Sequence, residues 1–297
     1  MSIKHLIRQL LVGILKKHRL ICIDALRESG RNAIVLDYDL QSIQRYGYGN
    51  VPHRLLYNII NNNRDSYRNI LEKYLQYSNY FFDIPTFITD SSASPYWGNT
   101  WFPAIDAMSL YYFLCLYNPK NYWEIGAGHS TKFARRAIKD HELRTKIISI
   151  DPQPRVAIDE MCDSIVRRKL EDLDLTIFDK IEEHDILFVD GTHQCFMNSD
   201  VTVIFMEVLP QLKNNVLVHF HDIFLPYDYP LGWEERYYSE QYLLGSWILS
   251  NPERFKIILA NYFILNDPTL NQILLPIFGK LEIDLTKQFG SSFWIMT

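Results

Sequence analysis

The chain has 297 residues, of which 47% are hydrophobic and 14% aromatic, enough to bury a sizeable core. Its formal net charge of -5 gives no electrostatic reason to expect a nucleic-acid partner. No apolar run reaches the roughly 18 residues that a membrane-spanning helix needs. The four cysteines lie far apart and form no CxxC pair, which predicts free thiols in a reducing, cytoplasmic compartment.

The first 20 residues combine a basic face with apolar residues at helical spacing. Arg8 interrupts the apolar stretch and no small-residue cleavage site follows, which argues against a signal peptide. We expect this helix to pack on its own domain or on a second subunit, so a homo-oligomer stays open. Membrane-surface contact through residues 1–20 is the less favoured alternative. Residues 1–82 as a whole are predicted to be a helical N-terminal accessory segment, with loops at 47–51 and 61–63.

Residues 83–297 are predicted to form an α/β domain. An irregular, aromatic-rich connector at 83–103 leads into a helix over 104–117, and strands and helices then alternate as in a largely parallel sheet. The expected strands cover 121–124, 146–150, 164–168, 185–189, 216–220, 255–263 and 293–296, and two further expected helices cover 198–209 and 240–249.

A glycine turn connects the first expected strand to the helix that follows it. Gly126 and Gly128 let the backbone turn sharply and approach a ligand closely. Ser130 and Thr131 are suited to cap the helix. Strand, turn and helix N-terminus together form a cradle for a small molecule, with an ordinary tight connection as the alternative.

Polar residues stand at the carboxyl ends of the later strands, where an open α/β sheet binds its ligands. Asp151 follows the second strand, at a position where a carboxylate can accept both hydroxyls of a ribose. A dinucleotide fingerprint would need a third glycine where Thr131 stands, so a ribosyl ligand without phosphates is favoured over a nicotinamide cofactor. The other polar residues at strand ends are Glu171, Asp172, Asp190, His193, His219, His221 and Asp222.

Four stretches together resemble the class I S-adenosylmethionine-dependent methyltransferases, and more narrowly a bacterial branch that often accompanies glycan or natural-product biosynthesis. They read Glu-Ile-Gly-Ala-Gly-His-Ser-Thr (124–131), Asp-Ile-Leu-Phe-Val-Asp-Gly-Thr-His (185–193), Ser-Asp-Val (199–201) and Val-His-Phe-His-Asp-Ile-Phe-Leu-Pro-Tyr-Asp-Tyr-Pro (218–230). The resemblance implies a Rossmann-like, seven-stranded, mostly parallel sheet with an antiparallel last strand. It also implies that residues 83–297 are an S-adenosylmethionine-binding methyltransferase domain.

The same resemblance implies contacts to the cofactor S-adenosylmethionine. Gly126 and Gly128 would face its methionine part, with Glu124 near the amine. Asp151 would bind the ribose, and the segment containing Glu171 and Asp172 would lie near the adenine. The remaining expected cofactor-binding residues are Ala127, Ser130, Thr131 and Asp190.

Asp190, His193 and Asp222 are expected to form the reaction centre, because Asp190 and Asp222 end adjacent strands. Two carboxylates repel each other, and Mg²⁺ or another divalent cation would relieve the repulsion and hold acceptor oxygens. His193 can take the proton of a hydroxyl group as its oxygen attacks the methyl group.

Metal-dependent O-methyltransferases of macrolide sugars have a similar Asp-x-x-His segment, which implies a metal on Asp190 and a base at His193. Their later pair of acids is replaced here by His221-Asp222. The expected metal ligands are therefore Asp190, His221 and Asp222, although Mg²⁺ prefers oxygen to imidazole. His221 can equally be the partner that supports a ligand. His219 is expected in the core, and His129 in the wall of the cofactor pocket.

Aromatic residues before the first strand and after the fifth are expected to line an acceptor pocket, since aromatic faces suit sugars and flat rings. They are Trp97, Trp101, Tyr227, Tyr229, Trp233, Tyr237 and Tyr238. The sequence thus favours O-methylation of a hydroxyl on a sugar or glycosylated small molecule, so the partner is a small-molecule or glycan acceptor. Two alternatives on the same fold stay open: a metal-dependent hydroxylase-like enzyme that binds iron, and a non-catalytic scaffold.

Overall fold

The computed structural model describes residues 40–88, 94–287 and 289–297. The chain divides into two compact units between Ser42 and Ile43, and the unit from Ile43 to Thr297 contains the sheet. The helix expected over 1–20 lies outside the described residues. The split expected between 1–82 and 83–297 stays a prediction. The structure places the helices from Arg54 onward in the same compact unit as the sheet.

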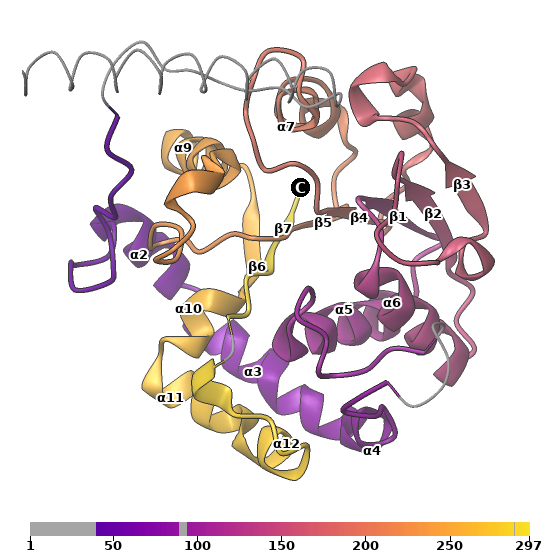
Figure 1. Cartoon of the computed structure of the whole chain (residues 1–297), viewed down its shortest axis with the longest axis horizontal. Coiled ribbons are helices and arrows are strands. Elements are labelled where there is room, and N and C mark those ends of the chain that lie inside the picture. Colours follow the sequence, from indigo (N-terminus) through magenta and orange to yellow (C-terminus); the bar gives the residue numbers. More distant parts are fainter. Residues whose placement is uncertain (1–39, 89–93, 288) are drawn as a thin grey trace, which may run out of the picture. The chain divides into compact units, whose positions relative to one another are not determined.

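The unit from Ile43 to Thr297 is built on a seven-stranded sheet with the order β3-β2-β1-β4-β5-β7-β6 (Figure 1). The strands β3, β2, β1, β4 and β5 are parallel, and β7 runs antiparallel to both of its neighbours, β5 and β6. This confirms the expected Rossmann-like sheet. The strands are β1 (Asn121–Ile125), β2 (Lys146–Ile150), β3 (Ser164–Val166), β4 (Ile186–Val189), β5 (Leu217–Phe220), β6 (Lys256–Ala260) and β7 (Phe293–Met296).

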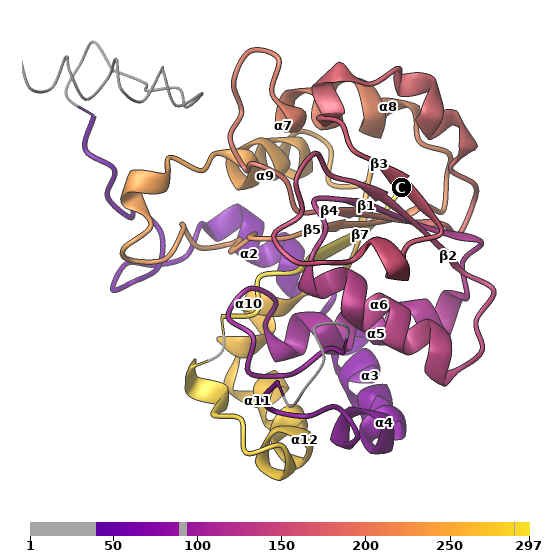
Figure 2. The ribbon, with the colours of Figure 1, turned by 45° about the vertical axis from the view of Figure 1, so that its right-hand side comes forward.

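Helices cover both faces of the sheet (Figures 1 and 2). On one face lie α5 (Ala104–Tyr117) and α6 (His129–Asp140), with α3 (Arg64–Tyr74) beyond α5, while α7 (Asp200–Val203) and α9 (Glu240–Ser250) lie on the other. The remaining helices are α2 (Arg54–Asn61), α4 (Ser78–Phe82), α8 (Leu209–Gln211), α10 (Asn261–Leu265), α11 (Pro268–Asn271) and α12 (Leu275–Lys280). In the part of the chain that the structure describes, no helix is long and apolar enough to cross a membrane.

The centre of the sheet is buried on both faces, which explains its apolar strands. All residues of β4 and β5 are buried, including His219, whose ring stacks on Phe188 at 3.9 Å between centroids. Such strands form nearly continuous apolar runs rather than alternating ones. Residues 104–114 of α5 are also all buried, because this helix is enclosed by its neighbours. The expected core position of His219 is therefore confirmed, and its Nε2 lies 2.7 Å from the Ser292 hydroxyl.

Two elements end at residues other than those the sequence predicted. The strand expected over 255–263 ends at Ala260, and the chain turns into α10. The Asn261 side chain donates hydrogen bonds to Asp106 and to the Ser109 hydroxyl, both on α5, which draws the chain away from the sheet. The helix expected over 198–209 contains a π-helical turn from Ile204 to Val208 and continues to Gln211. Pro210 stands one residue before the end of this continuous helix, and the backbone becomes extended at Leu212.

The helix after the glycine turn begins earlier than expected. α6 starts at His129, so Ser130 and Thr131 lie inside its first turn rather than at its cap. The Thr131 hydroxyl accepts a hydrogen bond from the Gly128 N–H at 3.0 Å, and in this way it still closes the helix end. Gly128 has a φ of 177°, an extended conformation open to any residue, so only Gly126 in this turn requires glycine.

Gly126 fixes the distance between the β1 turn and the end of β4. Its φ is +78°, in the left-handed region, and a Cβ there would overlap the carbonyl oxygen of Asp190. A hydrogen bond holds the same junction, since the Asp190 N–H donates to the Ile125 carbonyl at 2.8 Å. The Gly126 N–H donates to the Ile150 carbonyl at 3.1 Å, which holds the turn to the end of β2 as well. The glycine turn and the residues after β4 are therefore held in contact.

We expect Gly126→Ala to lower the free energy of unfolding by about 2–4 kcal/mol, because it adds both backbone strain and a clash with buried main chain. The measurement is urea-induced unfolding followed by circular dichroism. Gly128→Ala is the matched control, because a Cβ at Gly128 meets only Val156, at 3.9 Å. Equal destabilisation by the two substitutions would contradict this account of the turn.

Candidate active site

A cleft of about 980 Å³ lies at the carboxyl ends of the parallel strands. It brings together most of the residues singled out from the sequence. Its lining includes ten of the thirteen expected catalytic, cofactor-binding and metal-binding residues: Gly126, Ala127, Gly128, Ser130, Asp151, Glu171, Asp190, His193, His221 and Asp222. Glu124, Thr131 and Asp172 do not line it, and Asp172 is exposed to solvent. His129 lines the cleft, as expected for a residue of its wall.

Asp151 connects the end of β2 to the glycine turn. Its Oδ2 accepts a hydrogen bond from the Ala127 N–H at 2.8 Å, and its Oδ1 accepts one from the Gln153 N–H at 2.7 Å. The carboxylate therefore shapes this end of the cleft as well as lining it. Each of its oxygens keeps a further lone pair, which a ligand hydroxyl can use.

Glu124 lies beneath the turn and is fully buried. Its Oε1 accepts a hydrogen bond from the Tyr122 hydroxyl at 2.8 Å, and its Oε2 accepts one from the Thr131 hydroxyl. Burial raises the pKa of Glu124 to about 7, although hydrogen bonds from Ser130, Thr131 and Tyr122 oppose the shift. Glu124 thus ties β1 to the first turn of α6 from below.

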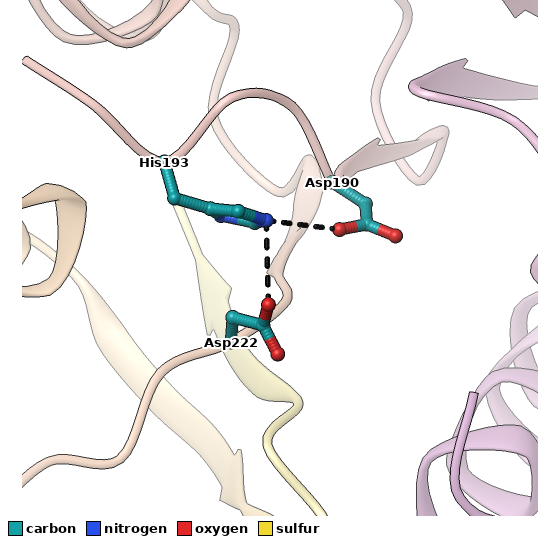
Figure 3. A group of neighbouring side chains, drawn as sticks. All are labelled: Asp190, His193 and Asp222. Carbon is teal, nitrogen blue, oxygen red and sulfur yellow. Dashed lines mark ion pairs between the residues drawn. The ribbon is translucent and has the colours of Figure 1, made fainter. Parts of the chain in front are cut away.

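His193 lies at the centre of the reaction-centre residues (Figure 3). Its Nε2 is 3.2 Å from Asp190 Oδ1 and 3.4 Å from Asp222 Oδ2, so one nitrogen faces carboxylates from two strand ends. Its Nδ1 is 2.8 Å from Glu240 Oε2. Candidate ligand atoms of Asp190, His193 and Asp222 all lie within 4.8 Å of one another. The structure therefore places the three expected residues together.

His221 faces the same two carboxylates from the other side. Its Nδ1 lies 3.6 Å from Asp190 Oδ1 and 3.5 Å from Asp222 Oδ1. Its Nε2 lies 3.4 Å from Asp106 Oδ2 on α5. Asp106 is fully buried and accepts hydrogen bonds from the Ser291 and Ser292 N–H groups and from the Asn261 amide. His221 is thus held between the core and the cleft.

The carboxylates set the charge of both histidines. Burial alone lowers the pKa of His193, but hydrogen bonds to Asp190 and Glu240 and the charge of Asp222 raise it well above its usual value. Burial likewise lowers the pKa of His221, but the charge of Asp190 and the hydrogen bond to Asp106 raise it well above normal. Burial raises the pKa of Asp190, yet the two imidazoles lower it by more. In this state the histidines are the cations of the site.

The loop that carries His193 is held by α7 as well. Asp200 accepts hydrogen bonds from the Thr192 N–H at 2.7 Å and the Thr192 hydroxyl at 2.5 Å. A Cβ at Gly191 would overlap the Asp200 carboxylate. Asp200 belongs to the quoted Ser-Asp-Val stretch, and its role is to fold this loop against the end of β4.

Glu240 and Asp106 were missed by the sequence analysis. Each looks like an acid in the first turn of a helix, a common and usually solvated arrangement. One signal was available for Asp106, which is a charged residue in a helix that is otherwise apolar on every side. For Glu240 the sequence holds no comparable signal, because its partner His193 lies 47 residues away.

Part of the chain that contains this site matches a known protein family. Residues 123–223, about a third of the chain, match the family model described as a methyltransferase domain. This stretch contains the glycine turn and the whole Asp190, His193 and Asp222 cluster. These residues therefore form a methyltransferase domain. The sheet order, with antiparallel β7 between β5 and β6, is the one implied by the resemblance to class I S-adenosylmethionine-dependent methyltransferases.

Solved structures resemble this methyltransferase only loosely. An O-methyltransferase from Bacillus cereus in complex with S-adenosylhomocysteine (SAH) is 12% identical, covers 77% of this chain and 90% of its own, and has a TM-score of 0.40. The plantazolicin methyltransferase BamL, in complex with a triazolic desmethylPZN analog and SAH, is 14% identical, covers 82% of this chain and 99% of its own, and has a TM-score of 0.40. No curated protein matches the chain significantly. Similarity at this level carries no information about the acceptor of this methyltransferase.

The raised pKa of Glu124 predicts a pH-dependent cost. The folded state holds the proton of Glu124 up to about pH 7, whereas the unfolded chain releases it near the ordinary glutamate pKa of 4.5. The contribution of this group to the free energy of unfolding therefore falls as pH rises between these values. We expect Glu124→Gln to gain stability relative to the parent protein by up to about 3 kcal/mol across that window.

The measurement is urea-induced unfolding of both proteins at several pH values. Glu160→Gln, at an exposed position, is the control and should follow the parent protein. A difference between Glu124→Gln and the parent that stays constant with pH, or shrinks as pH rises, would show that Glu124 does not titrate as a buried acid.

Proposed function

We propose that this methyltransferase transfers a methyl group from S-adenosylmethionine to a hydroxyl on a sugar or glycosylated small molecule, with His193 as the base. One observation carries the proposal. The imidazole of His193 lies at the cleft, against Asp190, and Asp190 in turn contacts the glycine turn. A proton acceptor is therefore held next to the part of the cleft that suits the methyl donor.

The donor would occupy the end of the cleft that is lined by the glycine turn, Asp151 and Glu171. The backbone from Gly126 to Gly128 would pass its methionine part, Asp151 would bind the ribose hydroxyls, and Glu171 would lie near the adenine. Glu124 and Thr131 would act through the turn that they brace. When bound, the donor supplies a sulfonium-activated methyl group.

In the proposed reaction the acceptor oxygen forms a bond to the methyl carbon while the bond from that carbon to sulfur breaks. Nε2 of His193 takes the hydroxyl proton, and SAH leaves as a neutral thioether. General-base help of this kind contributes about 10²–10⁴-fold to a rate. Alignment of the reacting atoms in the cleft can supply roughly 7–11 kcal/mol more.

The acceptor would lie against the aromatic end of the cleft. Trp233 and Tyr238 line it, and the Tyr238 ring is 4.7 Å from the His193 ring. The Arg236 guanidinium lies 3.7 Å from the centre of the Trp233 ring, which leaves a flat, polar-edged surface. Such surfaces suit the faces of sugar rings.

We also propose a divalent cation, Mg²⁺ or a similar ion, held by Asp190, Asp222 and His221. The donor set fits such an ion, because the His221 Nδ1 lies 3.6 Å from Asp190 Oδ1 and 3.5 Å from Asp222 Oδ1. A bound cation would supply the positive charge that the two histidines supply in its absence. His193 would then lose its proton more readily and could serve as a base near neutral pH.

For the cellular setting we propose the cytoplasm. The three described cysteines, Cys115, Cys162 and Cys195, are all free thiols, which suits a reducing compartment. A homo-oligomer and contacts of residues 1–20 stay predictions, since these residues lie outside those that the structure describes.

Calorimetry with SAH tests the donor site, and we expect binding in the micromolar range. Asp151→Asn should weaken binding about tenfold, because a ribose hydroxyl loses a charged acceptor. Asp179→Asn, at an exposed carboxylate outside the cleft, should bind like the parent. Tight binding of Fe²⁺ without binding of SAH would favour the hydroxylase-like alternative. Binding of neither would favour the non-catalytic scaffold.

Calorimetric titration with Mg²⁺ tests the cation. We expect saturable binding that Asp222→Asn abolishes and Asp179→Asn leaves unchanged, because Asp222 is one of the two carboxylates of the proposed site and Asp179 lies outside it. Methyl transfer should stop in EDTA and return when Mg²⁺ is added in excess. Full transfer in the presence of EDTA would refute the cation and leave the donor site standing.

A further inference from the structure

The shortest ion-pair distance of His193 is to an acid that lies outside the four motifs quoted above. Glu240, the first residue of α9, is 1% exposed, and its Oε2 lies 2.8 Å from His193 Nδ1. Its other oxygen, Oε1, is buried and has no hydrogen-bond partner among the described residues. An acid buried in this way has one favourable use, which is to hold the imidazole.

The main chains around the two residues are joined as well. The N–H groups of Ser239 and Glu240 donate to the His193 carbonyl at 2.8 and 3.1 Å. The Ser239 hydroxyl accepts from the Cys195 N–H at 2.8 Å. His193 has a φ of +60°, a conformation that a non-glycine residue keeps only when its surroundings impose it. The start of α9 therefore fixes both the backbone and the ring of His193.

The contact decides which ring nitrogen is free. An ionised carboxylate only accepts, so Nδ1 keeps a proton directed at Glu240. Nε2 faces carboxylates as well, but Asp190 and Asp222 lie at 3.2 and 3.4 Å, farther than Glu240 at 2.8 Å. A neutral ring then keeps the proton of the shorter contact and carries its lone pair on Nε2, the nitrogen that faces the cleft. Without Glu240 the preference would reverse, because Nε2 faces Asp190 and Asp222 and would donate to them.

We propose that Glu240 is a positioning residue for methyl transfer, which holds His193 in the tautomer with its proton on Nδ1 and its lone pair on Nε2. This inference rests on the proposed function, in which His193 is the base. Glu240 acts through His193 and is not among the residues that line the cleft. The start of α9 thereby becomes part of the proposed reaction centre.

The test is a histidine-selective ¹⁵N NMR experiment, which reports which ring nitrogen carries the proton and needs no acceptor. The full chain is measured with Mg²⁺ and SAH at mildly alkaline pH, and the His193 signals are assigned by their loss in His193→Gln. We expect the proton on Nδ1 in the parent and mainly on Nε2 in Glu240→Leu. Glu240→Gln keeps an acceptor oxygen at the same place and should keep the parent tautomer. Glu235→Leu, at an exposed acid on the same segment, is the control.

Thermal unfolding and SAH binding confirm that each variant is folded. If Glu240→Leu does not fold, Glu240→Gln is measured in its place. Loss of the low-field, slowly exchanging Nδ1 proton signal in Glu240→Gln then supports the inference, because an amide oxygen is a weaker acceptor than a carboxylate. A parent ring with its proton on Nε2, or tautomers unchanged in Glu240→Leu, would overturn it. A parent ring protonated on both nitrogens throughout would instead overturn His193 as the base, and the proposed function with it.

Discussion

The backbone of Gly126 lies directly against the carbonyl of Asp190, and both halves of the cleft depend on that contact. β1 and β4 are neighbours in the sheet, so the turn after one strand and the acid after the other leave from the same edge. Any side chain at Gly126 would push them apart. The proposed donor end of the cleft and the proposed reaction centre therefore meet at the contact between the backbones of Gly126 and Asp190.

The charged side chains near this contact form one cluster of acids and histidines, and each acid has a histidine as its partner. His193 and His221 lie among four carboxylates, those of Asp106, Asp190, Asp222 and Glu240. Buried acids are costly unless they are paired, and the two imidazoles pair with all four. The helices on opposite faces of the sheet each contribute one acid, Asp106 from α5 and Glu240 from α9. The reaction centre is thereby fixed to both layers of the fold.

The sequence predicted the cleft side of this cluster but not its supporting side. Asp190, His193 and Asp222 could be found because parallel strands end at one edge, and residues after adjacent strands must lie close together. Glu240 and Asp106 belong to helices, and a helix leaves the sheet edge in a direction that the local sequence does not specify. Their acids therefore looked like ordinary first-turn residues. The end of β6 at Ala260 escaped prediction for the same reason, since Asn261 turns toward partners on α5.

The sequence by itself determined the succession of strands and helices along the chain, the glycine turn, and the set of polar residues that follow the strands at one edge of the sheet. These follow from local periodicity and from the rule that places ligands at strand ends. Only the tertiary structure decided that Glu124 lies beneath the turn rather than in the cleft, and that both histidines are held from behind by buried acids. Those outcomes depend on which helix packs over which strand end, and such contacts between distant segments leave no pattern in the local sequence.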